Sequence, residues 1–290
     1  MAAQSTPPIT YRPATLADIA AEHGVFSRAE GSLLRRHGFA WSDPPLASFA
    51  ATQEHLFEHD PGRCFVAESE GRIVGFTDAW VRDDRWFLSA LFIDPGAQGH
   101  GIGRTLFGLA FEGAPGRRIT ITDAIQPVSN ALYGRHGLLP STPILEFTGT
   151  GLAVAPVAGL SEVTATNEIL AGLDAAAYGF DRAADHAFWA RQAHRRAWAR
   201  DGRPIAVSYT WPRGRIGPIL GLDGPSAADA LRMELHANPA GSVSMPGTSR
   251  ALVGAALAAG MRLGAPPGLL LLGDGLPAPT SLAISDYSLF

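Results

Sequence analysis

Apolar residues in the first half of the chain change between strand-like and helix-like spacing. Residues 64–82 contain two strand-like runs separated by Glu70-Gly71, which predicts a β-hairpin. Residues 88–93 form a nearly continuous apolar run, typical of a strand covered on both faces. Residues 105–111 continue at helical spacing, and residues 118–123 alternate as a strand does. The pattern therefore predicts strands that alternate with helices.

The second half of the chain repeats this order. Residues 11–14 introduce a helical segment with Leu16, Ile19 and Val25, and residues 154–157 introduce another with Leu160, Val163, Ile169 and Leu173. The later elements expected are strands at 203–211, 215–222, 241–247 and 268–274, a helix starting at Ser226 with Asp229 in a variant capping box, and a helix over 248–260. Residues 148–156 are rich in small residues, as domain junctions are. We therefore expect two domains, 1–148 and 149–290.

A glycine-rich turn follows the apolar run at 88–93. Asp94-Pro95-Gly96 ends the strand, and Gly99, Gly101 and Gly103 lead into the helix. The first amides of a helix lack partners within the helix and lie at the positive end of its dipole, so the turn is suited to a diphosphate. A Walker loop is excluded because the chain has no lysine, and the glycine spacing does not fit the dinucleotide fingerprint.

The pattern Gln98-x-x-Gly101-x-Gly103 resembles the acetyl-CoA signature of the GNAT N-acetyltransferases. Residues 129–138 (SNALYGRHGL) are similar to the helix after the fifth strand in that family, and the resemblance covers about residues 10–148. It implies an α+β fold with two tandem GNAT-like domains, each a mixed, mostly antiparallel sheet flanked by helices. In the second copy, 222–226 reads Leu-Asp-Gly-Pro-Ser without the signature, so we expect a degenerate domain that binds no CoA.

The resemblance implies a set of residues for acetyl-CoA, the co-substrate. The fourth strand would hold the pantetheine arm through its backbone, the glycine-rich turn would hold the diphosphate, and an Asn of the later helix would meet the cofactor. These residues are Leu91, Phe92, Ile93, Gln98, Gly99, His100, Gly101, Ile102, Gly103, Arg104 and Asn130.

The same resemblance implies direct attack of a primary amine on the thioester, without an acyl-enzyme. Tyr133 would protonate the leaving thiolate, and the alternative is an aromatic residue that packs on the sheet. Asp78 lies among apolar residues and is the candidate base or the anion that holds a cationic amine, unless it is a satisfied edge residue. Glu22, Glu30 and Asp43 fall in the acceptor region, but we expect them on solvated helix faces.

We therefore expect an N-acetyltransferase that acts on the amine of a small molecule. The alternatives are a non-catalytic acyl-CoA sensor or scaffold and an enzyme for a longer acyl-CoA. The net charge of −4 gives no basic stripe, which argues against a nucleic-acid partner. The N-terminus does not resemble a signal peptide and residues 251–259 are too short to cross a bilayer, so we expect a cytoplasmic protein without a membrane partner. A homodimer is left open.

Two further motifs carry other chemistry. Cys64 is the single cysteine and begins an apolar strand, so we expect a small core residue rather than a nucleophile. His55-Leu56-Phe57-Glu58-His59 matches the HxxEH pattern of zinc peptidases. A catalytic zinc site also needs a third ligand and a cleft, and this pair lies at the end of a helix. We therefore expect an exposed polar helix face there and no metal.

Overall fold

The computed structural model describes residues 8–264 and 266–290 of the 290-residue chain. Their contacts form two compact units. The first consists of the described residues up to Val81 together with Trp86–Arg118, and the second of Arg82–Arg85 together with Ile119–Phe290. No helix within the described ranges is long and apolar enough to cross a membrane. The expectation that the N-terminus is not a signal peptide rests partly on residues 1–7, which lie outside the described residues.

The first unit contains a sheet in the order β1-β2-β3-β4. Its strands are β1 (Thr10–Pro13), β2 (Cys64–Ser69), β3 (Arg72–Arg82) and β4 (Arg85–Ile93). β2 pairs antiparallel with both β1 and β3. The β2–β3 turn has left-handed backbone at Glu70 (φ 50°) and Gly71 (φ 71°), as a two-residue hairpin turn requires. The predicted hairpin is confirmed.

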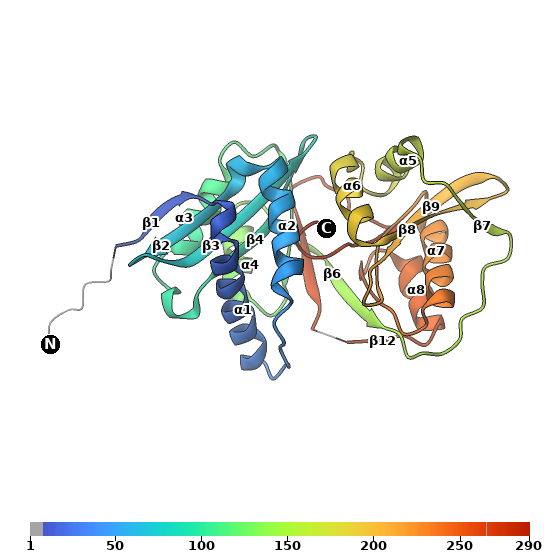
Figure 1. Ribbon diagram of the computed structural model, residues 1–290, viewed down its shortest axis with the longest axis horizontal. Coiled ribbons are helices and arrows are strands. Elements are labelled where there is room, and N and C mark those ends of the chain that lie inside the picture. Colours follow the sequence, from blue (N-terminus) through green and yellow to red (C-terminus); the bar gives the residue numbers. More distant parts are fainter. Residues whose placement is uncertain (1–7, 265) are drawn as a thin grey trace. The chain divides into compact units, whose positions relative to one another are not determined.

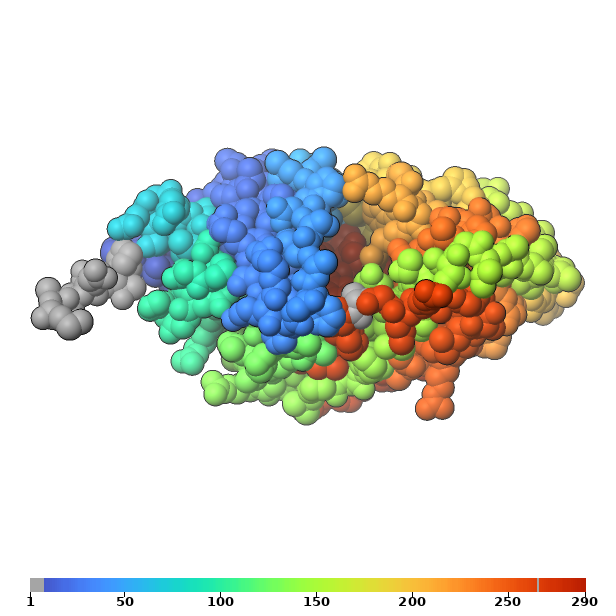
Figure 2. All heavy atoms as spheres, turned by 90° about the horizontal axis from the view of Figure 1, so that it is seen from below, coloured from blue at the N-terminus to red at the C-terminus, as the bar shows by residue number. Residues whose placement is uncertain are grey.

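Three helices pack on this sheet (Figure 1). They are α1 (Ile19–Arg36), α2 (Leu46–His59) and α3 (Ile102–Phe111), with short 3-10 turns at Leu16–Asp18, Pro61–Arg63 and Pro95–Ala97. α1 and α2 contact each other and lie side by side on the surface in Figure 2. Side chains alternate along a strand, and one core cluster contains Val66, Phe76 and Phe92 with residues of α1 and α2. The neighbouring positions Ala67, Leu91 and Ile93 pack with α3, so the helices cover opposite faces of the sheet.

Eight of the ten strands described in the second unit follow the order β5-β13-β6-β11-β10-β9-β8-β7, while β12 pairs with β6 and β14 with β10. The strands are β5 (Arg117–Asp123), β6 (Leu139–Thr148), β7 (Leu160–Val163), β8 (His194–Arg200), β9 (Arg203–Thr210), β10 (Arg215–Gly221), β11 (Ser242–Pro246), β12 (Arg262–Leu263), β13 (Gly268–Leu272) and β14 (Leu282–Ala283). The helices are α4 (Pro127–Gly134), α5 (Asn167–Ala177), α6 (Ala183–Gln192), α7 (Gly224–Ala237) and α8 (Arg250–Ala258). β10 and β11 are parallel, and the other pairs described in this unit are antiparallel, which confirms the α+β class.

Strands from one half of the sequence pair with strands from the other half. β13, from the second half, lies between β5 and β6 and pairs antiparallel with both. β6, from the first half, also pairs with β11. Residues 119–148 therefore pack with the second unit, although the repeat places them before the expected junction at 148. The boundary near residue 118 separates the two units by their contacts. It does not test the predicted functional domains, 1–148 and 149–290, which stay a prediction.

Several predicted elements of the second half differ in detail. Leu160–Val163 forms β7 rather than a helix, because it pairs with β8, a strand that the sequence pattern did not predict. α7 begins at Gly224 rather than Ser226, and its N-cap is Asp223, whose side chain accepts a hydrogen bond from the Ser226 amide. β13 is followed by the short strand β14, which the sequence pattern did not predict. The remaining predicted strands, at β9, β10 and β11, are confirmed.

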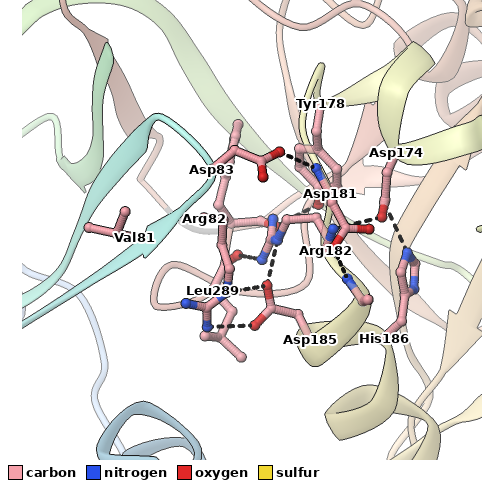
Figure 3. A network of polar contacts seen from close by, with 12 residues as sticks. Val81, Arg82, Asp83, Asp174, Tyr178, Asp181, Arg182, Asp185, His186 and Leu289 are labelled. Carbon is pink, nitrogen blue, oxygen red and sulfur yellow. Dashed lines mark hydrogen bonds and ion pairs between the residues drawn. The ribbon is translucent and has the colours of Figure 1, made fainter. Parts of the chain in front are cut away.

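A buried polar network organises the second unit around Asp185 (Figure 3). Its carboxylate accepts hydrogen bonds from Arg82 at 3.1 Å and from Arg182 at 2.5 Å. The Arg182 side chain is fully buried, and its guanidinium lies 4.7 Å from the ring centre of Tyr178 and 5.1 Å from that of Trp189. Opposite charge and cation–π contacts together compensate the burial of this cation.

Candidate functional site

The glycine-rich turn between β4 and α3 is open to solvent. Gly99 (φ 87°) and Gly101 (φ 80°) have left-handed backbone, which L side chains rarely adopt. A Cβ atom placed on either glycine would meet no atom within 4 Å. The surface of the turn is therefore backbone, and a ligand can approach it closely.

Side chains before the turn fix its shape without covering it. Asp94 Oδ1 accepts a hydrogen bond from the Gly96 amide at 3.0 Å, and Asp94 Oδ2 pairs with Arg28 Nε at 2.6 Å. Gln98 Nε2 donates to the Ile93 carbonyl at 3.0 Å. These contacts tie the end of β4 to the turn and leave the exposed side chains of His100 and Arg104 on the solvent side.

The N-terminus of α3 has no side-chain cap. Gly101 is its N-cap residue, and the amides of Arg104 and Thr105 donate to the Gly101 carbonyl at 3.1 and 3.2 Å. The preceding amides of the first turn have no intrahelical acceptor and lie at the positive end of the helix dipole. An anion can therefore accept hydrogen bonds from them.

The equivalent turn of the second half is closed. The Asp223 carboxylate accepts a hydrogen bond from the Ser226 amide at 2.8 Å, and this bond lowers the pKa of Asp223. A Cβ atom on Gly221 would lie 2.5 Å from the Ala227 nitrogen. The protein itself therefore supplies the anion that caps α7, which supports the expected loss of CoA binding in this copy.

The other residues implied for the cofactor lie in two places. Leu91, Phe92 and Ile93 are half-buried at the end of β4. Asn130 lies on α4 in the second unit, where its Nδ2 donates to the Asp123 carbonyl at 3.3 Å. Among the described residues, its Oδ1 atom is buried without a hydrogen-bond partner. An amide donor of a bound pantetheine arm would fit this acceptor.

Tyr133 also lies on α4 and is 4% exposed. Burial raises the pKa of its hydroxyl well above the ordinary value near 10, and the charge of Asp123 acts in the same direction. The hydroxyl therefore keeps its proton across the physiological range, as a proton donor must.

Asp78 belongs to a buried polar cluster inside the first unit. Gln53 Nε2 donates to Asp78 Oδ2 at 2.8 Å and to Glu22 Oε2 at 2.9 Å. Both carboxyl groups are fully buried, and Cys64 faces Asp78 across the β2–β3 pair. The expectation that Cys64 is a small core residue is confirmed, since its thiol is buried and burial raises its pKa.

The two carboxyl groups share one buried space, and they differ in protonation. Burial, together with the nearby charge of Asp78, raises the pKa of Glu22 to about 9. Burial also raises the pKa of Asp78, to about 6, against the opposing hydrogen bond from Gln53. At neutral pH the cluster therefore holds a neutral Glu22 beside an ionised Asp78.

The expectation of a solvated Glu22 is wrong. Glu22 lies between Ile19 and Val25 at helical spacing, and all three are buried on the inner face of α1. This helical spacing from buried apolar residues could have predicted the burial of Glu22. Gln53 has the same spacing, since it lies three residues before the buried Leu56. Asp43 is exposed as expected, and Glu30 is half-buried.

The sequence profile of the Acetyltransferase (GNAT) family matches residues 27–138, which include the glycine-rich turn and Tyr133. This part of the chain is similar to members of the GNAT family. Acetyltransferases of that family use acetyl-CoA, and the similarity supports an acyltransferase. A comparison with curated proteins gives no significant sequence match.

Solved structures resemble this chain over at least 93% of its length. A putative acetyltransferase from Pyrococcus horikoshii has a TM-score of 0.79 at 17% identity, covering 100% of this chain and 99% of that one. A GCN5-related N-acetyltransferase from Sphaerobacter thermophilus has a TM-score of 0.64 at 14% identity, covering 95% and 100%. A tandem GNAT protein from the clavulanic acid biosynthesis pathway has a TM-score of 0.59 at 16% identity, covering 93% and 100%. At these identities the likeness shows the fold, which is that of tandem GNAT proteins.

Proposed function

We propose that this protein transfers an acetyl group from acetyl-CoA to the primary amine of a small molecule. The observation that carries the proposal is the N-terminus of α3, where two left-handed glycines and an uncapped first turn are open to an anion. The diphosphate would accept hydrogen bonds from amides of Gly99, Gly101, Ile102 and Gly103, and Gln98 would hold the turn in shape through Ile93. His100 and Arg104 would face the nucleotide from the exposed side of the turn.

The proposed chemistry is direct attack of a neutral amine on the thioester carbonyl. A backbone amide of β4, near Phe92, would polarise that carbonyl, and the leaving thiolate would take a proton from Tyr133. The raised pKa of Tyr133 supports this role, because the hydroxyl enters the reaction protonated. The buried Asn130 acceptor would hold the cofactor beside α4.

Asp78 is the proposed base or counter-anion for the amine. A pKa of about 6 keeps it ionised at neutral pH and close to the range that suits a general base. Its complete burial supports a second role, the placement of α2 on β3 through Gln53. The two roles separate in an Asp78→Asn variant, because the new amide oxygen can still accept the Gln53 hydrogen bond. Loss of a base lowers kcat and changes its pH dependence, whereas a structural role alone leaves kcat unchanged.

The acceptor and the setting are part of the same proposal. The second domain, with its own turn closed by Asp223, would shape the acceptor pocket and favour a small molecule over a protein. We place the enzyme in the cytoplasm, with no nucleic-acid or membrane partner, and with a homodimer as one assembly to examine.

Steady CoA release tests catalysis against the alternative, a non-catalytic acyl-CoA sensor. The purified protein is given acetyl-CoA and a panel of primary amines, and propionyl-CoA and longer acyl-CoAs are tested in parallel. Tyr133→Phe should abolish CoA release while acetyl-CoA affinity in calorimetry stays unchanged. Tyr11→Phe, a half-buried tyrosine on β1, is the matched control and should keep the activity. Tight binding without turnover on any amine would support the sensor instead.

A further inference from the structure

The last turn of α2 brings together His55, Glu58 and His59. Their positions i, i+3 and i+4 lie on one face of a helix. One ligand atom from each side chain lies within 4.8 Å of the other two, and the two imidazole ring centres are 4.5 Å apart. The expected exposed polar face is therefore only partly correct, because His55 is 2% exposed while Glu58 and His59 are exposed.

The hydrogen bonding of His59 leaves one ring nitrogen for a ligand. Its Nδ1 lies 3.0 Å from the His55 carbonyl oxygen. Because a carbonyl oxygen can only accept, Nδ1 carries the hydrogen and Nε2 keeps its lone pair. Histidines that bind metals commonly donate their other N–H to a carbonyl in this way, which fixes the ring orientation.

The donor set determines the class of ion. Two imidazoles and one carboxylate suit zinc and similar transition metals, whereas magnesium and calcium prefer oxygen ligands alone. With metal–ligand bonds of about 2.0–2.2 Å, ligand atoms in a tetrahedral site lie about 3.4 Å apart. The exposed side chains of Glu58 and His59 can close this difference by small rotations.

We propose that His55, Glu58 and His59 form a binding site for a divalent transition metal of the zinc class on the last turn of α2. The site holds the ion with three protein ligands, and water completes the coordination. It differs from a zinc-peptidase centre because Glu58 belongs to the ligand set rather than serving as a free base. The ion would link the buried His55 to the exposed Glu58 and His59. The same helix carries Gln53. The site is separate from the glycine-rich turn and does not depend on the proposed activity.

Calorimetric titration of the untagged, metal-free protein with Zn²⁺ tests this site. We expect one equivalent to bind, and we expect His59→Ala and Glu58→Gln each to weaken binding by roughly tenfold or more. Co²⁺ should give visible absorption bands typical of a site with protein ligands, and these bands should disappear in His59→Ala. Both altered side chains are exposed, and circular dichroism confirms that the variants fold.

His37→Ala is the matched control. His37 directly follows the last residue of α1, and its Nδ1 lies 3.0 Å from the Leu33 carbonyl oxygen, the same contact four residues back that His59 makes. It belongs to no group of ligand atoms among the described residues. The control should bind Zn²⁺ as the unaltered protein does. Absence of binding at millimolar Zn²⁺, or equal binding by His59→Ala and the unaltered protein, would overturn the proposal.

Discussion

Replacing Glu22 by Gln probes the protonation of the buried carboxyl pair. Glutamine has nearly the same shape as a neutral glutamic acid, and its side-chain oxygen can still accept the hydrogen bond from Gln53. If Glu22 is neutral in the folded protein at pH 7, the variant keeps the contact and loses only the titration. The substitution therefore removes the titration of the Glu22 carboxyl group and keeps its hydrogen bond.

The sign and size of the effect follow from the raised pKa of Glu22. The ordinary carboxyl value is 4.5 and the folded value is about 9, so between these values the folded state binds more protons than the unfolded state. The contribution of Glu22 to the free energy of unfolding is fully present at low pH. It falls by about 1.4 kcal/mol per pH unit as the pH rises toward 9. Between pH 6 and pH 8 the unaltered protein should therefore lose about 3 kcal/mol relative to Glu22→Gln.

Urea denaturation at pH 6, 7 and 8 measures this difference. The free energy to compare is that of the unfolding transition in which β3 loses its structure. Hydrogen-exchange mass spectrometry shows which transition this is. Titratable groups distant from Glu22 contribute equally to both proteins, so their effects cancel in the comparison. Glu54→Gln is the control, because it makes the same change at an exposed position of α2 and should not alter the pH dependence. Equal pH slopes for Glu22→Gln and the unaltered protein would refute the neutral Glu22.

Three further predictions concern packing and charge. Asp185→Asn should destabilise the second unit by on the order of 3–5 kcal/mol in urea, because Arg182 is left buried without a full counter-charge, and a small change would contradict this. Gly75→Val should lower the melting temperature, since even a Cβ atom there would lie 2.7 Å from Ile93 Cδ1, and a neutral effect would show that β3 and β4 can separate. Asp223→Ala should cost about 1 kcal/mol as a lost helix cap and should create no acetyl-CoA binding, which calorimetry checks.

Local features of the sequence predicted local structure well. The β2–β3 hairpin follows from two strand-like runs around Glu70-Gly71, and the turn into α3 follows from an apolar strand ended by proline and glycine. Both depend on residues within a few positions of each other, where backbone preferences decide the result. Cys64 was correctly placed in the core because it begins a short apolar strand.

Long-range arrangements could not be predicted in the same way. The apolar run of β13 reads as a strand, but nothing in it specifies pairing with β5 and β6, more than a hundred residues earlier. Glu22 was misplaced because a carboxyl group is normally exposed, and its burial depends on Gln53 from another helix. Candidate residues on the glycine-rich turn are recognisable from spacing, whereas a polar cluster assembled from α1, α2 and β3 appears only in the fold.

Acetyl-CoA affinity of Gly103→Glu, compared with Gly108→Glu, tests the central claim most directly. Both glycines lie in α3 with helical backbone, and a Cβ atom makes ordinary contact at the first and none within 4 Å at the second. A carboxylate in the first turn favours the helix but repels a diphosphate, by about 4 kcal/mol for unit charges about 4 Å apart near a protein surface. Calorimetry should show roughly a hundredfold or greater loss for Gly103→Glu and unchanged affinity for Gly108→Glu. Wild-type affinity in Gly103→Glu would show that acetyl-CoA, if it binds, does not bind at the start of α3.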